Sequence, residues 1–148
     1  MANVSDIHRQ ILDAWNRRDW DTFRSLLHPD YRYIGPEGKE LVGTEAGLNL
    51  AKMYANAFPD GKIEIKNVFV AGTTAVCEFV ARGTHKGDLK GVAPTGKRVE
   101  INVCNVMEVR DGKSYREREY MDMLTGRMEY LHGGLSLCLA VFMAQRAR

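Results

Sequence analysis

The sequence has few cysteines, few prolines and almost no net charge, and each shortage excludes a class of protein. Its 148 residues include three cysteines and four prolines, and the formal net charge is +2. Cys77, Cys104 and Cys138 lie far apart and form no CxxC pair, so we expect reduced thiols rather than a disulfide framework or a cysteine metal site. The basic residues are scattered among acids without a basic stripe, and no nucleic-acid partner is expected.

Long apolar runs are also missing. The most apolar segment, GLSLCLAVFMA at residues 134–144, has 11 residues, whereas a helix needs about 20 to cross a bilayer. The first ten residues, MANVSDIHRQ, are polar and contain no apolar signal core. These features predict a cytoplasmic protein that has no membrane partner.

Several catalytic and cofactor motifs are absent as well. The sequence contains no GxSxG, no P-loop, no dinucleotide fingerprint and no HxxxH pair. GDLKG and GVAPTG carry glycines, but their spacing fits neither phosphate-binding motif. We therefore predict neither a metal site nor a cofactor.

The composition and length of the chain are typical of one globular domain. It is 45% hydrophobic and 27% charged, and a chain of this length buries about two-thirds of its unfolded surface. Apolar residues at three-to-four-residue spacing predict a helix from about Val4, with Ser5 as its cap. A short helix is predicted over 20–27, ended by His28-Pro29, and a third runs from Thr44, as its cap, to about 57.

Most of the remaining sequence is predicted to form β-strands. Alternating or β-rich stretches predict strands over 31–35, 62–72, 74–85, 97–109 and 114–124, and Arg110-Asp111-Gly112-Lys113 predicts a hairpin. Helices followed by a run of antiparallel strands indicate the α+β class. A curved antiparallel sheet closed by the N-terminal helices would leave a pocket on its concave face.

Several motifs together resemble one family. GTHKG (83–87), APTGKRVE (93–100) and the DGK hairpin followed by YMD (120–122) are similar to the SnoaL-like polyketide cyclases of the NTF2-like superfamily, from Val4 to Leu124. The resemblance implies a cone-shaped fold around a deep pocket, a homodimer, and chemistry without a cofactor. We expect one domain over 1–148, with an atypical apolar tail over about 125–148.

The resemblance also implies catalytic residues. In the cyclases an aspartate on the last strand is the general base of an intramolecular aldol ring closure, and Asp122 matches it. Asn105 is the match to a polar pocket partner on the preceding strand, and His85 in GTHKG could polarise a carbonyl. Each has a plain structural alternative: a salt bridge from Asp122 to Arg118 or Arg82, and backbone or structural hydrogen bonds for His85 and Asn105.

The alternation of side chains predicts which residues of the last strand share a face. If it alternates regularly, Asp122 shares one face with Arg118 and Tyr120, and the other face carries Glu117, Glu119 and Met121. A small apolar or aromatic substrate would then contact pocket residues, although many such side chains are plain core. The predicted substrate-binding residues are Trp15, Tyr33, Met53, Phe58, Arg118 and Tyr120.

Other functions remain open at this point. The superfamily includes ketosteroid isomerases and epoxide hydrolases. The epoxide hydrolases use an Asp–Arg–Asp arrangement, and Asp122 with Arg82 or Arg118 could supply part of that arrangement. The same cup could also hold a ligand without transforming it, with residues 134–144 as an interaction surface.

Overall fold

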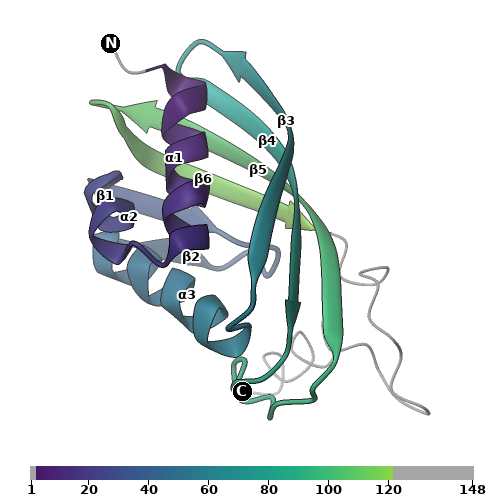
Figure 1. Cartoon of the computed structure of the whole chain (residues 1–148). Helices are drawn as coiled ribbons and strands as arrows, with labels where there is room; N and C mark the ends of the chain where they lie inside the picture. Colours follow the sequence, from purple (N-terminus) through teal and green to yellow (C-terminus); the bar gives the residue numbers. More distant parts are fainter. Residues whose placement is uncertain (1–2, 122–148) are drawn as a thin grey trace.

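The computed structural model describes residues 3–121. Three helices and six strands follow one another along this part of the chain (Figure 1). They are α1 (Val4–Arg17), α2 (Trp20–Ser25), β1 (Leu27–Ile34), β2 (Glu40–Val42), α3 (Thr44–Ala57), β3 (Lys62–Ala71), β4 (Thr74–Thr84), β5 (Arg98–Arg110) and β6 (Lys113–Met121). The α+β class predicted from the sequence is confirmed.

The helix ends use caps that differ in part from the predicted ones. The side chain of Asn3, not Ser5, caps α1 by accepting a hydrogen bond from the Ser5 backbone N–H at 3.1 Å. The N-cap of α3 is Gly43, which has a positive φ of 97°. Thr44 is the first helical residue, and its hydroxyl donates to the carbonyl of His28 at 3.0 Å, which ties α3 to β1.

The strands form one six-stranded mixed sheet in the order β2-β1-β6-β5-β4-β3. The pairs from β3 to β6 are antiparallel as predicted, but β1 lies parallel to β6. The prediction of a purely antiparallel sheet was therefore wrong. Parallel strands need a long crossover connection, and α3 with strands β3 to β5 provides it here, which hairpin signals alone do not reveal.

The turn between β5 and β6 is the hairpin that the sequence predicts. Asp111 and Gly112 both have positive φ, 50° and 70°, as two-residue hairpin turns of this kind require. Just beyond the turn the register shifts: Val109 pairs with Ser114, but Glu108 pairs with Arg116. One extra residue on β6, Tyr115, forms a bulge at this point.

The bulge decides which side chains of β6 face the interior. Counting back from the turn without it would place Asn105 opposite Arg118, whereas Asn105 actually pairs with Glu119. A one-residue shift exchanges the two faces of a strand. Arg118 therefore points outward, where its guanidinium donates to Glu108 at 3.0 Å, and the Tyr120 side chain is 58% exposed. The predicted facing of these two residues was wrong for this reason.

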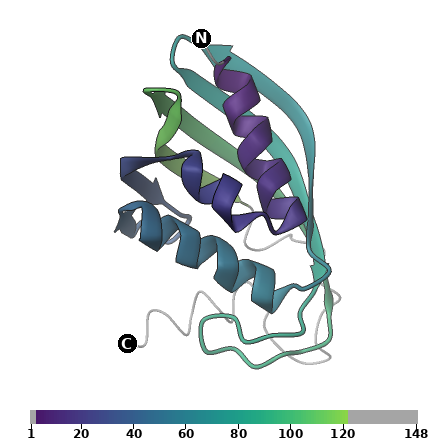
Figure 2. The same ribbon diagram turned by 60° about the vertical axis from the view of Figure 1, so that its left-hand side comes forward.

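The helices cover the concave side of the sheet (Figures 1 and 2). The main core joins α1 to the sheet through Ile7, Ile11, Ala14, Leu27 and Met107, all buried. Helix α3 packs closely on β1, because a Cβ added at Gly47 would lie 2.5 Å from the Tyr31 ring. Among residues 3–121 no helix is long and apolar enough to cross a membrane.

Candidate functional site

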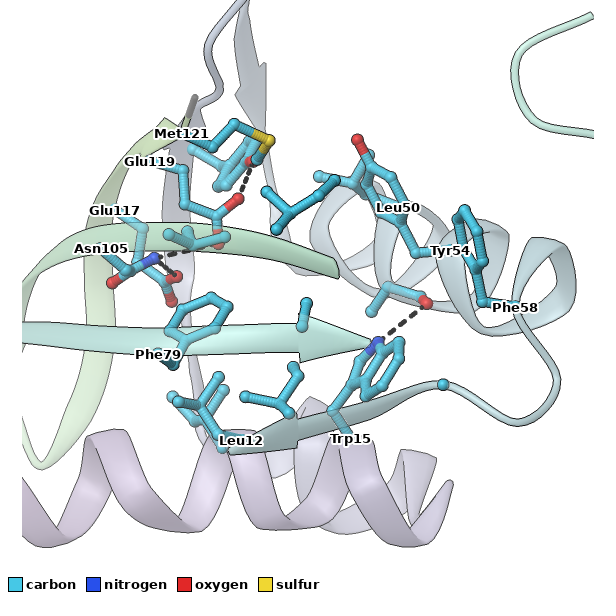
Figure 3. Close-up of a pocket in the computed structure, with 18 of the residues that line it drawn as sticks. Leu12, Trp15, Leu50, Tyr54, Phe58, Phe79, Asn105, Glu117, Glu119 and Met121 are labelled. Atoms are coloured by element: carbon cyan, nitrogen blue, oxygen red, sulfur yellow. Dashed lines mark hydrogen bonds between the residues drawn. The ribbon is translucent and has the colours of Figure 1, made fainter. Parts of the chain in front are cut away.

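A cavity of about 210 Å³ lies between the helices and the concave face of the sheet (Figure 3). Helices α1 and α3 form one wall, and strands β4, β5 and β6 form the other. Most of the surface is apolar, with large side chains that include Leu12, Trp15, Leu50, Phe58, Phe79 and Val103. The pocket predicted on the concave face is therefore present.

Two carboxyl groups of β6 lie in this apolar surface. Glu119 accepts a hydrogen bond from the Tyr33 hydroxyl at 2.5 Å, and Glu117 accepts one from the Ser114 hydroxyl at 2.6 Å. The Asn105 amide nitrogen donates to both acids, at 3.0 Å to Glu117 and 3.4 Å to Glu119. Figure 3 shows this chain of groups, in which one amide joins two carboxyl groups.

Burial and charge change the acidity of this cluster. Burial raises the pKa of Glu119, the neighbouring charge of Glu117 raises it further, and hydrogen bonds from Tyr33 and Asn105 oppose the rise. Burial and the nearby Glu119 carboxylate also raise the pKa of Tyr33. Tyr33 therefore stays a neutral hydrogen-bond donor, and Glu119 keeps its proton to a higher pH than an ordinary glutamate.

A histidine of α1 also lines the cavity. His8 is 1% exposed. Burial lowers its pKa, while the negative charge of Glu117 and a side-chain hydrogen bond with Asn105 oppose the lowering. The imidazole is thus neutral at pH 7, with one N–H donor and one nitrogen acceptor.

Some of the residues predicted as site residues lie in this cavity. Asn105, Trp15, Tyr33 and Phe58 all line it. The Trp15 indole N–H donates to the carbonyl of Ala51 at 3.1 Å, which fixes the ring between α1 and α3. Asn105 is the one polar side chain on its face of β5, and it is buried on the cavity side.

Other predicted residues lie elsewhere. Met53 is not among the lining residues; it packs instead on a small cluster of Ala57, Leu89 and Val99. His85 is fully buried but also outside the cavity lining. Its Nδ1 lies 3.1 Å from the Thr95 hydroxyl, and its backbone pairs with Lys97 and Gly96. His85 therefore closes the loop over 86–96, and Asp122 lies outside the described residues.

The acids and the histidine of the cavity were not predicted as site residues. Glu117 and Glu119 were assigned to the outer face because Asp122 was expected to face inward, and the bulge at Tyr115 leaves no clear signal in the sequence. His8 did leave a signal: it precedes Ile11, Leu12 and Trp15 by three, four and seven residues, the spacing of one helix face. A polar residue within an apolar helix face indicates either a satisfied core group or a ligand contact.

Helices that close the concave face of a curved sheet around such a cavity are the arrangement of the NTF2-like fold. The structure superposes with a TM-score of 0.63 on an NTF2-like protein of Cytophaga hutchinsonii, at 14% identity over 82% of this chain and 92% of that one. The TM-score is 0.76 with a SnoaL-like protein of Jannaschia sp. CCS1, at 23% identity over 82% of this chain and 86% of that one. These likenesses establish the fold.

The sequence narrows the class to one family. The family model described as SnoaL-like polyketide cyclase matches residues 5–128, and the chain belongs to this family. It is also similar to the aklanonic acid methyl ester cyclase AcmA of Streptomyces galilaeus. The two are 25% identical over 116 residues, which cover 77% of this chain and 81% of AcmA.

Proposed function

We propose that this protein is a cofactor-independent cyclase that closes a ring in a small apolar or aromatic carbonyl compound by proton transfer, in an intramolecular aldol-type reaction. The observation that carries the proposal is the Glu119 carboxyl group, which stands in an apolar cavity with a raised pKa. Perturbed carboxyl groups in clefts are typical of acid–base sites. The similarity to a cyclase, AcmA, supports the same class of reaction.

Ring closure needs a base and an acid. Asp122, which matches the family's aspartate, is the proposed base and takes a proton from a carbon next to a carbonyl group. Because Met121 lines the cavity, this role requires the alternation of inward and outward side chains to break between Met121 and Asp122. The resulting enolate attacks a second carbonyl of the same molecule, and the new alkoxide receives a proton from Glu119. Each turnover moves one proton to Asp122 and one from Glu119, and exchange with solvent restores both groups. The raised pKa of Glu119 suits the role of the acid.

The surrounding residues support the acid role of Glu119. Tyr33 donates to one of its oxygens and Asn105 to the other, so both are positioning residues that fix the carboxyl group against the apolar wall. His85, predicted to stabilise the enolate, does not line the cavity.

The surroundings of the arginines argue against the alternative function of an epoxide hydrolase. Arg82 lines the cavity, but its two carboxylate partners, Glu100 at 2.8 Å and Glu64 at 2.5 Å, do not. These three side chains are 37–55% exposed. The two acids inside the cavity share the amide of Asn105 instead of a guanidinium. The interior therefore offers proton transfer rather than an arginine-centred pair of acids.

A simple substrate tests the proposal. The diketone 1-(2-acetylphenyl)propan-2-one closes to a six-membered ring by intramolecular aldol addition, and loss of water gives a fluorescent methylnaphthol. We expect the protein to accelerate this reaction over buffer, and Glu119→Gln to remove most of the acceleration. Binding of the diketone without any acceleration would contradict the proposal and favour a non-catalytic ligand-binding protein.

A further inference from the structure

Two loops that are far apart in the chain meet at one end of the cavity. The turn between β1 and β2 contributes Pro36 and Glu37 to the lining, and the loop over 86–96, between β4 and β5, contributes Leu89. The Glu37 side chain is also 25% exposed. A side chain that both lines a cavity and contacts solvent lies at an opening, so these two loops border a mouth of the cavity.

An ion pair joins the two loops at this mouth. The Lys90 ammonium donates to a carboxylate oxygen of Glu37, and it lies 5.9 Å from the centre of the Tyr54 ring on α3. The Lys90 side chain is 17% exposed. In the other pairs of a lysine or arginine with an acid within residues 3–121, each side chain is 30–61% exposed. Water and salt therefore screen the Lys90–Glu37 pair less than those pairs.

The backbone at Lys90 indicates that the lysine does more than form a turn. Leu89 and Val92 exchange two backbone hydrogen bonds of 3.0 Å, and between them Lys90 and Gly91 have positive φ angles of 53° and 87°. Asparagine and glycine are favoured at the first of these two positions, because most other residues are strained there. Strained residues are kept where they serve a function. Here the lysine places a long cationic side chain at the tip of the loop, where it reaches Glu37.

The base of the loop is held separately from its tip. The backbone N–H groups of Lys86 and Gly87 donate to the carbonyl of Ala57 at 2.9 and 3.1 Å, which ties the base to the end of α3. The tip, residues 88–94, packs on Ala57 through Leu89 and contacts the β1–β2 turn through the ion pair. The tip can therefore move away from the turn while the base stays in place.

We propose that the Lys90–Glu37 ion pair is a latch on the cavity. While the pair is formed, the tip of the loop and the β1–β2 turn narrow the mouth. When the pair breaks, the tip moves away and a ligand passes. Lys90 and Glu37 thus determine how fast compounds enter and leave. The latch acts whether a ligand is transformed or only bound, so this inference goes beyond the cyclase proposal and does not depend on it.

The binding kinetics of a neutral probe test the latch without any turnover. N-phenyl-1-naphthylamine is apolar and uncharged at neutral pH, and its fluorescence rises in an apolar environment, so stopped-flow fluorescence follows its entry into the cavity. Lys90→Asn removes the ammonium and keeps a residue suited to positive φ. We expect Lys90→Asn to raise the association and dissociation rate constants by the same factor, about threefold, and to leave the dissociation constant unchanged.

Matched variants separate the latch from other effects of charge. Lys66→Asn breaks an ion pair with Glu64 on β3, where neither residue lines the cavity, and should keep the wild-type rate constants. Exchanging the charges in the double variant Lys90→Glu, Glu37→Lys rebuilds the pair in reverse and should restore the slow rates that each single change loses. Added salt should accelerate exchange of the probe more in the wild type than in Lys90→Asn, because it weakens the ion pair.

Three results would overturn the latch. Wild-type rate constants in Lys90→Asn would show that ligands do not pass between these two loops. Faster dissociation with unchanged association would show that Lys90 holds the ligand and does not close the mouth. Failure of the probe to bind either protein would reject access through this mouth. Circular dichroism checks the fold of each variant, and Glu37→Gln replaces Lys90→Asn if the latter does not fold.

Discussion

Glu119 lies directly opposite Asn105 in the β5–β6 ladder, and its carboxyl group accepts a hydrogen bond from the Asn105 amide at 3.4 Å. Directly opposite residues of an antiparallel pair share one face of the sheet. This pairing therefore brings an acid and an amide together within the cavity. It also makes the acid–base properties of the site depend on the register of one hairpin.

Replacing Glu119 should abolish most catalysis without unfolding the protein. Glu119→Gln keeps the size of the side chain but cannot give a proton to an alkoxide, and general acid–base groups contribute about 10²–10⁴-fold to rates. The rate of methylnaphthol formation from the diketone measures the loss. Glu108→Gln, a change on the outer face of the same sheet, is the control and should retain the wild-type rate.

The raised pKa of Glu119 should also appear in the pH dependence of stability. A carboxyl group whose pKa is higher in the folded protein stabilises the fold below its ordinary value of 4.5, and this contribution is lost as pH rises through the folded pKa. Glu119→Gln removes that loss. The free energy of unfolding of Glu119→Gln relative to wild type should therefore increase as pH rises above 4.5, as measured by urea denaturation. A constant difference at all pH values would contradict the raised pKa.

Asn105 should be important for stability because it joins two buried acids. Asn105→Leu leaves Glu117 and Glu119 without their shared donor, and we expect unfolding to become easier by about 1–3 kcal/mol. Urea denaturation at neutral pH measures the change. The control is Asn102→Leu on the exposed face of the same strand, which should cost far less. Equal effects of the two variants would show that Asn105 has no special structural role.

Asp122 is the proposed base, and its replacement tests the part of the mechanism that comes from the family resemblance. Asp122→Asn should reduce ring closure by orders of magnitude while the thermal midpoint stays close to that of the wild type. If Asp122→Asn is fully active and Glu119→Gln is inactive, Glu119 is the base instead. The two variants are therefore measured side by side on the same diketone.

Local patterns in the sequence predicted most of the elements and the cavity. The spacing of Ile7 and Ile11 indicated α1, the Asp111-Gly112 pair located the last hairpin, and the alternation of β5 placed Asn105 inside. These features depend on residues close together in the chain. The parallel pairing of β1 with β6 depends on residues more than 80 positions apart, and no local pattern encodes it.

The candidate site was predicted less well than the fold, and the reason is specific. The family resemblance directed attention to Asp122, and regular alternation then placed Arg118 and Tyr120 inside with it. A single extra residue at Tyr115 reverses the facing of the strand at that point, so that Glu117 and Glu119 enter the cavity. A bulge is set by the balance of pairing and packing across several strands, which local sequence does not express.

The bulge at Tyr115 has a consequence for how proteins of this kind can diversify. Inserting or deleting one residue near the turn would exchange a lining of acids for one of arginine and tyrosine, while every side chain in the strand stayed the same. The register of the hairpin therefore determines which of the two sets of side chains lines the cavity. Comparing hairpin lengths among relatives should consequently be more informative about reactivity than comparing the identities of the strand residues alone.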